Sequence, residues 1–103
     1  MEQELTEMCR VIFASSINSE ISNTMITKLV NFAKNGKIPF KAKPINDYVF
    51  DNSFYNLGVL ELGEFKLYDS LTTGRDGDDI RMTRFIQLTK GEGENMRELC
   101  IEL

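Results

Sequence analysis

The dipeptide Asp76-Gly77 stands between two runs of alternating apolar and polar residues, and it constrains the fold of this 103-residue chain more than any other feature. Asp-Gly favours a two-residue hairpin turn because such a turn needs positive φ at its central positions. The pairs that this turn would create are Thr73 with Ile80, Leu71 with Met82, Asp69 with Arg84, Leu67 with Ile86, Phe65 with Leu88 and, on the other face, Tyr68 with Phe85. A slip of one residue would mix the two faces, so the pattern supports this register.

The neighbouring segments extend the same pattern. A turn at Gly63-Glu64 opposes Leu62 with Phe65 and Val59 with Tyr68. A last hairpin turns through residues 91–95, and its second strand carries Leu99, Ile101 and Leu103 on the apolar face. We therefore predict a four-stranded antiparallel meander with strands at about 54–62, 64–73, 79–90 and 97–103.

Helical periodicity precedes the sheet. Apolar residues recur at helical spacing over residues 2–14 and again over 19–35, where Asn35-Gly36 supplies a C-terminal stop. The first stripe consists of Leu5, Met8, Cys9, Ile12 and Phe13, and the second of Ile21, Met25, Leu29 and Phe32, widened by Ile26, Val30 and Ala33. A face as wide as the second is normally buried on more than one side.

Residues 38–50 connect the helices to the meander. Ile38, Phe40 and Ala42 alternate with lysines, but Pro39 and Pro44 lack amide donors, so this segment is expected to be an edge strand or an extended crossover. The fold class predicted is α+β, with two N-terminal helices packed on one face of the sheet. At this length residues 1–103 should form a single domain.

Charge is distributed unevenly although the net charge is only −4. Residues 1–20 hold four acids and one base, residues 21–46 hold five lysines and no acid, and residues 47–103 hold twelve acids and six bases. No window is apolar enough for a membrane span, and the acidic N-terminus differs from a secretory signal, so we expect a cytoplasmic protein without a membrane partner. Cys9 and Cys100 are expected to be reduced.

The residue inventory argues against most enzyme chemistry. The chain has no histidine, which excludes Ser-His-Asp and Cys-His nucleophile systems and the common zinc sets. The glycines do not cluster into a phosphate-binding loop. We therefore expect no catalytic set, no cofactor and no metal.

Two acidic arrangements could still suggest metal chemistry. Asp76, Asp78 and Asp79 do not match the ligand spacing of a calcium loop in either register. Glu64 and Lys66, with Asp47 or Asp51, resemble the acid and lysine set of metal-dependent nucleases, but Glu64 falls in a predicted turn. A metal-dependent hydrolase using these groups is kept as a remote alternative.

The lysine segment over residues 28–43 is an alternative site of another class. Nucleic-acid binding needs clustered cations and, for single strands, exposed aromatic rings. The candidates are Lys34, Lys37, Phe40, Lys41 and Lys43. The absence of arginine among them and the structural roles of lysine at a helix end and on an edge strand speak against this reading.

The outer face of the predicted sheet is the main candidate site. In the predicted register Val59, Tyr68 and Phe85 lie side by side, with Leu57 diagonal to them. Charged side chains rim this row, among them Arg81, Glu98 and Glu102. An aromatic centre with a charged rim is typical of a protein-binding surface. Two alternatives stay open: residues 38–55 could fold over this face, or the face could form a homodimer.

The expected function is that of a small acidic, non-enzymatic protein-binding domain. An inhibitor or regulatory accessory protein fits, of the immunity, antitoxin or virus-encoded anti-host type, whose acidic edges could occupy a basic groove on its protein partner. The alternative is a nucleic-acid-binding regulator that uses the lysine segment.

Overall fold

The computed structural model describes residues 1–16, 19–43 and 54–103. Its elements in chain order are α1 (Glu2–Ala14), α2 (Glu20–Lys34), β1 (Lys41–Ala42), β2 (Phe54–Leu62), β3 (Phe65–Asp76), β4 (Asp79–Lys90), the 3₁₀ helix η1 (Gly93–Asn95) and β5 (Arg97–Glu102). The strands form one antiparallel sheet in the order β1-β2-β3-β4-β5. The α+β class with two N-terminal helices is confirmed, with five strands instead of four.

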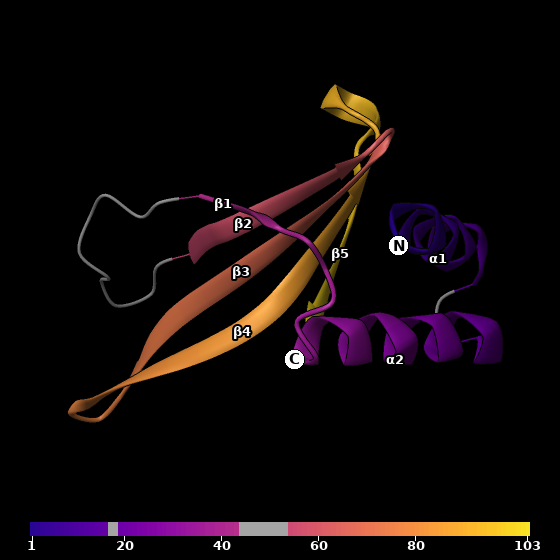
Figure 1. Ribbon diagram of the computed structural model, residues 1–103. Helices are drawn as coiled ribbons and strands as arrows, with labels where there is room; N and C mark the ends of the chain where they lie inside the picture. Colours follow the sequence, from indigo (N-terminus) through magenta and orange to yellow (C-terminus); the bar gives the residue numbers. More distant parts are fainter. Residues whose placement is uncertain (17–18, 44–53) are drawn as a thin grey trace.

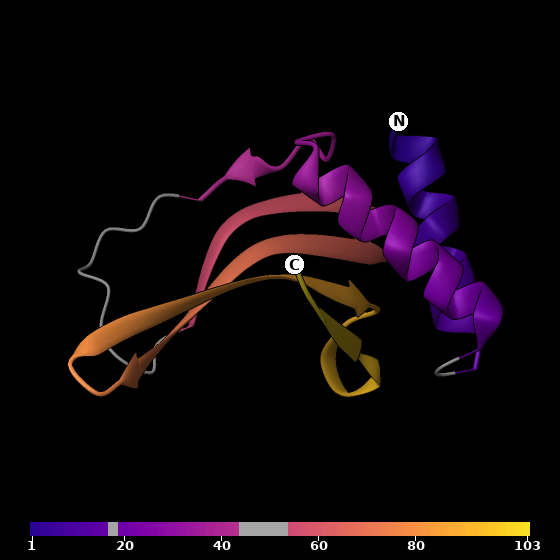
Figure 2. The same ribbon diagram turned by 90° about the horizontal axis from the view of Figure 1, so that it is seen from below.

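Both helices lie on one face of the sheet near one end, and the β3–β4 hairpin extends past them at the other end (Figure 1). Figure 2 shows the same arrangement from below, with the strands curving away from the helices toward the hairpin tip. Among the described residues no helix is both long and apolar enough to cross a membrane.

Local signals in the sequence fix the ends of α2. The Ser19 side chain accepts a hydrogen bond from the Ser22 amide, which caps the first turn. At the other end Gly36 has φ of 66°. The amides of Gly36 and Lys37 donate to the carbonyls of Ala33 and Phe32, the two bonds of a Schellman motif. The stop predicted at Asn35-Gly36 is confirmed.

The core lies between the helices and the inner face of the sheet, which is the face toward α1 and α2. It includes all five residues of the predicted α1 stripe together with Leu29 of α2. The sheet contributes Leu60, Leu62, Phe65, Leu67, Ile86, Leu88 and Ile101. The alternation of the strands therefore predicted which residues face the helices.

The apolar face of α2 is covered less than predicted. Leu29 is fully buried, but Ile21 is 62% exposed, and Met25 and Phe32 are only partly buried. Within the described residues this face packs against α1 and the sheet, so it is buried from two sides but less completely than its width suggests.

The register between β3 and β4 differs from the prediction by two residues. Asp76 pairs with Asp79, so Gly77 and Asp78 form the turn, and Gly77 takes its positive φ of 66° at the first turn position. Leu67 consequently lies opposite Leu88. A shift of two leaves every side chain on its predicted face, because side-chain direction repeats every two residues. Alternation alone does not distinguish such registers.

The β2–β3 hairpin has the predicted register, and the last hairpin joins β4 to β5 with the predicted residues on the apolar face. Leu62 pairs with Phe65 and Val59 with Tyr68 between β2 and β3. Leu99 pairs with Leu88 between β5 and β4. One irregularity was not predicted: Asn56 pairs with Ser70 and Gly58 with Asp69, so that Leu57 is the extra residue of a β-bulge.

The predicted edge strand is short. Lys41 and Ala42 pair with Val59 and Gly58, which makes β1 the edge of the sheet next to β2. The remaining part of the predicted segment, residues 44–50, lies outside the described residues. The same holds for most of the segment proposed to fold over the outer face, including Tyr48 and Phe50.

Candidate protein-binding surface

A row of four side chains crosses the outer face of the sheet, the face that points away from α1 and α2. Val59, Tyr68, Gln87 and Cys100 lie opposite one another on β2, β3, β4 and β5. The first three are half-buried and Cys100 is exposed. Val59 and Tyr68 are therefore adjacent, as predicted, but the third member of the row is Gln87.

Phe85 does not lie in this row, which corrects the predicted patch. Because of the two-residue shift it lies opposite Ser70 and Glu102, one pair further along the strands. Phe85 is only 8% exposed, and the centre of its ring lies 5.5 Å from the centre of the Phe54 ring in a tilted contact. Phe85 thus packs within the protein and offers little surface to a partner.

The lysines of β1 and its flank lie beside the row. Lys41 is opposite Val59, and the Lys43 amide donates a 2.7 Å hydrogen bond to the carbonyl of Leu57. The Lys43 Nζ lies 5.7 Å from the centre of the Tyr68 ring, in a cation–π geometry. Part of the predicted lysine site and the centre of the predicted aromatic site therefore form one surface.

A shallow pocket of about 360 Å³ adjoins these lysines at the β1 edge. It is lined by Pro39, Lys41, Ala42, Lys43, Val59, Leu60 and Glu61. Its wall combines two cations, one carboxylate and the apolar side chains of β2. Such a mixture fits a polypeptide better than a phosphate backbone, which needs positive charge alone.

The rest of the lysine segment lies elsewhere. Lys34 is in the last turn of α2, and the Lys37 Nζ lies 6.0 Å from the centre of the Phe32 ring. Phe40 is half-buried and packs against the core. Its ring is therefore not presented as a platform on which a nucleic-acid base could stack.

Acidic side chains stand at the opposite edge of the outer face, on β5. The Gln87 side-chain amide donates a 2.8 Å hydrogen bond to Glu98 Oε1, and the Cys100 thiol donates to the same oxygen at 3.6 Å. Partial desolvation raises the pKa of Cys100, and the hydrogen bond and the charge of Glu98 add to it. Glu98 and Glu102 are both exposed.

Arg81 lies far from the other predicted rim residues. It is opposite Gly74 on the β3–β4 hairpin, its side chain is 72% exposed, and its Nη2 forms a 2.6 Å ion pair with Asp76. Gln87 lies six positions further along β4, about 20 Å away at the rise of a strand. The two-residue shift and the extension of the hairpin remove Arg81 from the surface around Tyr68.

Those acids among the metal candidates that the structure describes do not form a cluster. In residues 1–16, 19–43 and 54–103, no three His, Cys, Asp or Glu side chains are placed to share a metal ion. Glu64 is exposed in the β2–β3 turn, and Lys66 lies on β3 opposite Glu61 and Thr89. Asp47 and Asp51 lie outside the described residues.

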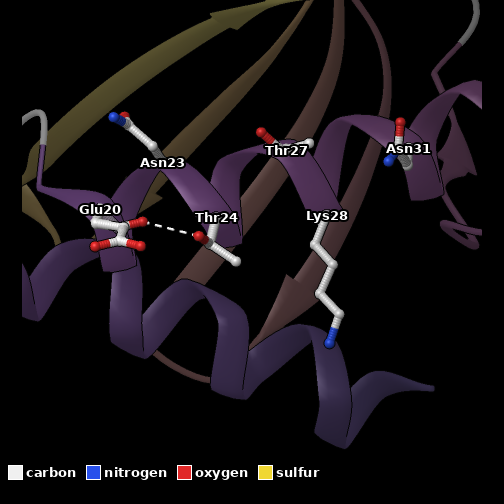
Figure 3. Close-up of a pocket in the computed structure, with 6 residues that line it drawn as sticks. All are labelled: Glu20, Asn23, Thr24, Thr27, Lys28 and Asn31. Atoms are coloured by element: carbon white, nitrogen blue, oxygen red, sulfur yellow. Dashed lines mark hydrogen bonds between the residues drawn. The ribbon is translucent and has the colours of Figure 1, made fainter.

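Two further concave regions lie near the helices. One is a broad depression of about 650 Å³ on the polar face of α2, lined by Glu20, Asn23, Thr24, Thr27, Lys28 and Asn31. Figure 3 shows that these six side chains all project from one helix, and the only bond drawn among them is from the Thr24 hydroxyl to the backbone carbonyl of Glu20. A solvated helix face of this kind lacks convergent groups.

The other concave region was missed by sequence reasoning. It is a pocket of about 190 Å³ between the C-terminal end of α1, the first turns of α2 and β5, lined by Ile12, Phe13, Ser15, Ser22, Asn23, Ile26, Arg97, Glu98 and Leu99. The Arg97 guanidinium lies 5.4 Å from the centre of the Phe13 ring and donates a 3.3 Å hydrogen bond to the Phe13 carbonyl. Three elements contribute to this pocket, so no local pattern in the sequence predicts it.

The fold defines a two-helix, five-stranded antiparallel α+β protein whose outer sheet face carries an amphipathic row between a basic and an acidic edge. Comparisons with protein-family models, with curated proteins and with solved structures found no match.

Proposed function

We propose that this protein is a non-enzymatic protein-binding domain that holds its partner on the outer face of the sheet. The observation that carries the proposal is the row Val59-Tyr68-Gln87-Cys100, with the Lys43 ammonium over the Tyr68 ring. A half-buried tyrosine flanked by aliphatic, amide and charged groups is the kind of anchor around which protein interfaces are built.

The charges at the two sides of the row favour a protein partner with both signs of charge. Lys41 and Lys43 supply cations at the β1 side, and Glu98 and Glu102 supply carboxylates at the β5 side. Electrostatic complementarity of this type fixes the orientation of a partner and speeds association. A small inhibitor or regulatory accessory protein, of the immunity, antitoxin or virus-encoded anti-host type, is the role we propose.

The alternative of a nucleic-acid-binding regulator is favoured by one observation, the proximity of Lys43 to the Tyr68 ring. The acidic β5 side of the same face and the packed ring of Phe40 oppose it. The two functions differ in salt dependence, because a complex with phosphates weakens steeply as counterions are added. Binding of single-stranded DNA or RNA at low ionic strength, lost on substitution of Lys41 and Lys43 by alanine, would favour the alternative.

The test of the proposal is the variant Tyr68→Ala. Immobilised wild-type protein and variant are used to capture proteins from a lysate of the source cells, and captured proteins are quantified by mass spectrometry. Loss of a central tyrosine anchor should lower the amount of the specific partner by about 10-fold or more. Thr27→Ala, on the polar face of α2, is the matched control and should capture as much as wild type.

The same experiment can contradict the proposal. Circular dichroism first shows that both variants keep the wild-type fold. If folded Tyr68→Ala then captures the same proteins in the same amounts as wild type, the row on the outer face is not the binding surface.

A further inference from the structure

Strand β5 is an edge of the sheet, and half of its backbone polar groups point away from the protein. The Leu103 amide donates to the carbonyl of Arg84. The odd-numbered residues of β5 therefore direct their amides and carbonyls toward β4. In an antiparallel pair the residues between them point the other way. The backbones of Glu98, Cys100 and Glu102 therefore face outward, and no backbone bond to them is found within the described residues.

The pocket of about 190 Å³ adjoins this open edge on its inner side. Phe13 and Ile26 form its apolar wall from the helices, and Leu99 forms it from β5 itself. A cavity of about 150 Å³ is known to hold a benzene-sized molecule, so the pocket has room for one leucine or phenylalanine side chain. A strand laid along β5 would direct its inner side chains toward this pocket, because successive side chains alternate between faces.

The charges along the edge define the chemistry of the occupant. Glu98 and Glu102 project from the outer face four residues apart, and both are exposed. On an added strand, the two residues opposite them would have the same spacing of four. Opposite charges on directly opposed strand residues stabilise a pair, so lysine or arginine is favoured at both positions.

We propose that the β5 edge binds an extended basic segment of a protein partner as an additional strand of the sheet. Lysine or arginine residues at positions i and i+4 of the segment face Glu98 and Glu102, and the apolar residue at i+1 or i+3 that faces Leu99 fills the pocket beside Phe13. This mode of recognition, β-strand addition, takes its affinity from main-chain hydrogen bonds and its specificity from alternate side chains. The inference goes beyond the outer-face proposal and does not depend on it.

A second copy of this chain is a poorer occupant of the edge. Two β5 strands that pair antiparallel about Cys100 engage all three outward-facing residues of each copy. This register places Glu98 of one copy opposite Glu102 of the other, and like charges in that position destabilise a strand pair. Registers centred on other residues engage fewer of the free backbone groups.

The test uses a synthetic peptide, acetylated and amidated at its ends, with the sequence TKLTVKT. Its two lysines have the required spacing, and its leucine and valine take the inner positions. A matched control peptide, TELTVET, reverses both charges and keeps everything else. Binding is followed by amide hydrogen exchange in two-dimensional NMR at increasing peptide concentration, up to the millimolar range.

The expected result is specific to strand addition. With TKLTVKT, the amides of Glu98, Cys100 and Glu102 should exchange at least about 10-fold more slowly than without peptide. The amides of Leu99 and Ile101, which already bond to β4, should change little. The control peptide should bind at least about 5-fold more weakly at low salt. Tyr68→Ala should leave this binding unchanged, which separates the result from the outer-face proposal.

Two variants sharpen the test. Cys100→Pro removes an outward-facing amide without removing a bond to β4, and it should abolish binding. Glu98→Lys combined with Glu102→Lys should reverse the preference, so that TELTVET binds better than TKLTVKT. The charge reversal keeps the proposal testable if the proline variant does not fold.

Three outcomes would overturn the proposal. The first is no slowing of exchange at Glu98, Cys100 and Glu102 with millimolar TKLTVKT. The second is equal binding of the two peptides by wild type. The third is a dimer in light scattering whose β5 amides are protected without peptide, because a second copy would then occupy the edge.

Discussion

The two cysteines are both free thiols, but their surroundings make them chemically different. Cys9 is completely buried in the apolar face of α1, within the core cluster. Desolvation in this site raises the pKa of Cys9 to about 12. Cys100 lies exposed on β5 beside Glu98, where its pKa is also raised. Cys9 therefore keeps its proton in the folded protein at alkaline pH that would ionise it in the unfolded chain.

This difference predicts a loss of stability at high pH. Because the folded pKa of Cys9 is raised above the unfolded value of 9.0, its contribution is complete below pH 9 and is lost as the pH rises from 9 toward about 12. The free energy of unfolding should fall in that range by up to about 1.4 kcal/mol per pH unit from this group. Urea denaturation of wild type and Cys9→Ala between pH 8 and 10.5 measures it. The two curves should converge as pH rises, and parallel curves would show that Cys9 does not titrate in this way.

At the scale of elements, Gly58 determines how β1 meets β2. Gly58 is buried opposite Ala42, directly after the β-bulge at Leu57. A Cβ atom at this position would lie 2.9 Å from the Cβ of Phe40 and 3.3 Å from the Lys41 carbonyl oxygen. Only glycine permits this approach, and the approach brings Lys43 over the Tyr68 ring.

We therefore expect Gly58→Ala to displace β1 from the sheet edge. Overpacking of this kind typically costs about 1–3 kcal/mol in the free energy of unfolding. The ring protons of Tyr68 should also shift in the NMR spectrum as Lys43 moves away. Gly63→Ala is the control, because a Cβ there meets no atom within 4 Å and only its positive φ of 64° carries a cost. An unchanged Tyr68 signal in Gly58→Ala would mean that the chain accommodates the methyl group without moving β1.

The arrangement of helices and strands could be predicted from the sequence only in part. Apolar residues at helical spacing were enough to place both helices, and alternation with the glycine turns was enough to pair β2 with β3 and β4 with β5. They were not enough for β3 and β4, because registers that differ by two residues sort the faces equally well. The predicted surface inherited this error: Val59 and Tyr68 were placed correctly, whereas Phe85 and Arg81 were not.

The contact between Lys43 and Tyr68 could not be predicted from the sequence either. The two residues are joined through the β1–β2 pairing, and β1 contains only two residues. So short a strand carries almost no periodic signal. The pocket beside β5 could not be predicted from a local pattern either, because its walls come from three separate elements.

At the scale of the whole molecule, the fold places the basic and the acidic segments of the sequence at opposite sides of the sheet. The lysines at Lys41 and Lys43 stand at the β1 side of the sheet, and the carboxylates at Glu98 and Glu102 stand at the β5 side. Three strands lie between the two groups, so they do not neutralise one another by direct contact. With strands about 4.8 Å apart, this face is about 19 Å wide. A standard interface of about 800 Å² per partner would therefore reach one or both edges.

The helices also divide the sheet into a covered body and an uncovered arm. The core cluster joins both helices to β2, β3, β4 and β5, but the described part of the β3–β4 hairpin from residue 75 to residue 82 is exposed throughout. Figure 1 shows this arm projecting beyond the helices. Ile80 and Met82 point to the inner face, yet they are 49% and 60% exposed because neither helix reaches them. The arm should therefore open locally without unfolding the body.

Limited digestion with an arginine-specific protease tests this division, because Arg75 and Arg81 lie in the arm whereas Arg97 is held against Phe13 in the body. Exposed tips are the preferred sites of proteolytic cleavage, so the first cut should follow Arg75 or Arg81, as mass spectrometry of the fragments would show. Substituting both arginines with glutamine should slow the loss of intact protein by about 10-fold, since the remaining sites open only with the body. Arg10→Gln, at an exposed position of α1, is the matched control and should not slow it. A first cut after Arg97, or a double variant digested as fast as wild type, would mean that the body opens as readily as the arm and that the β5 edge is not a preformed template.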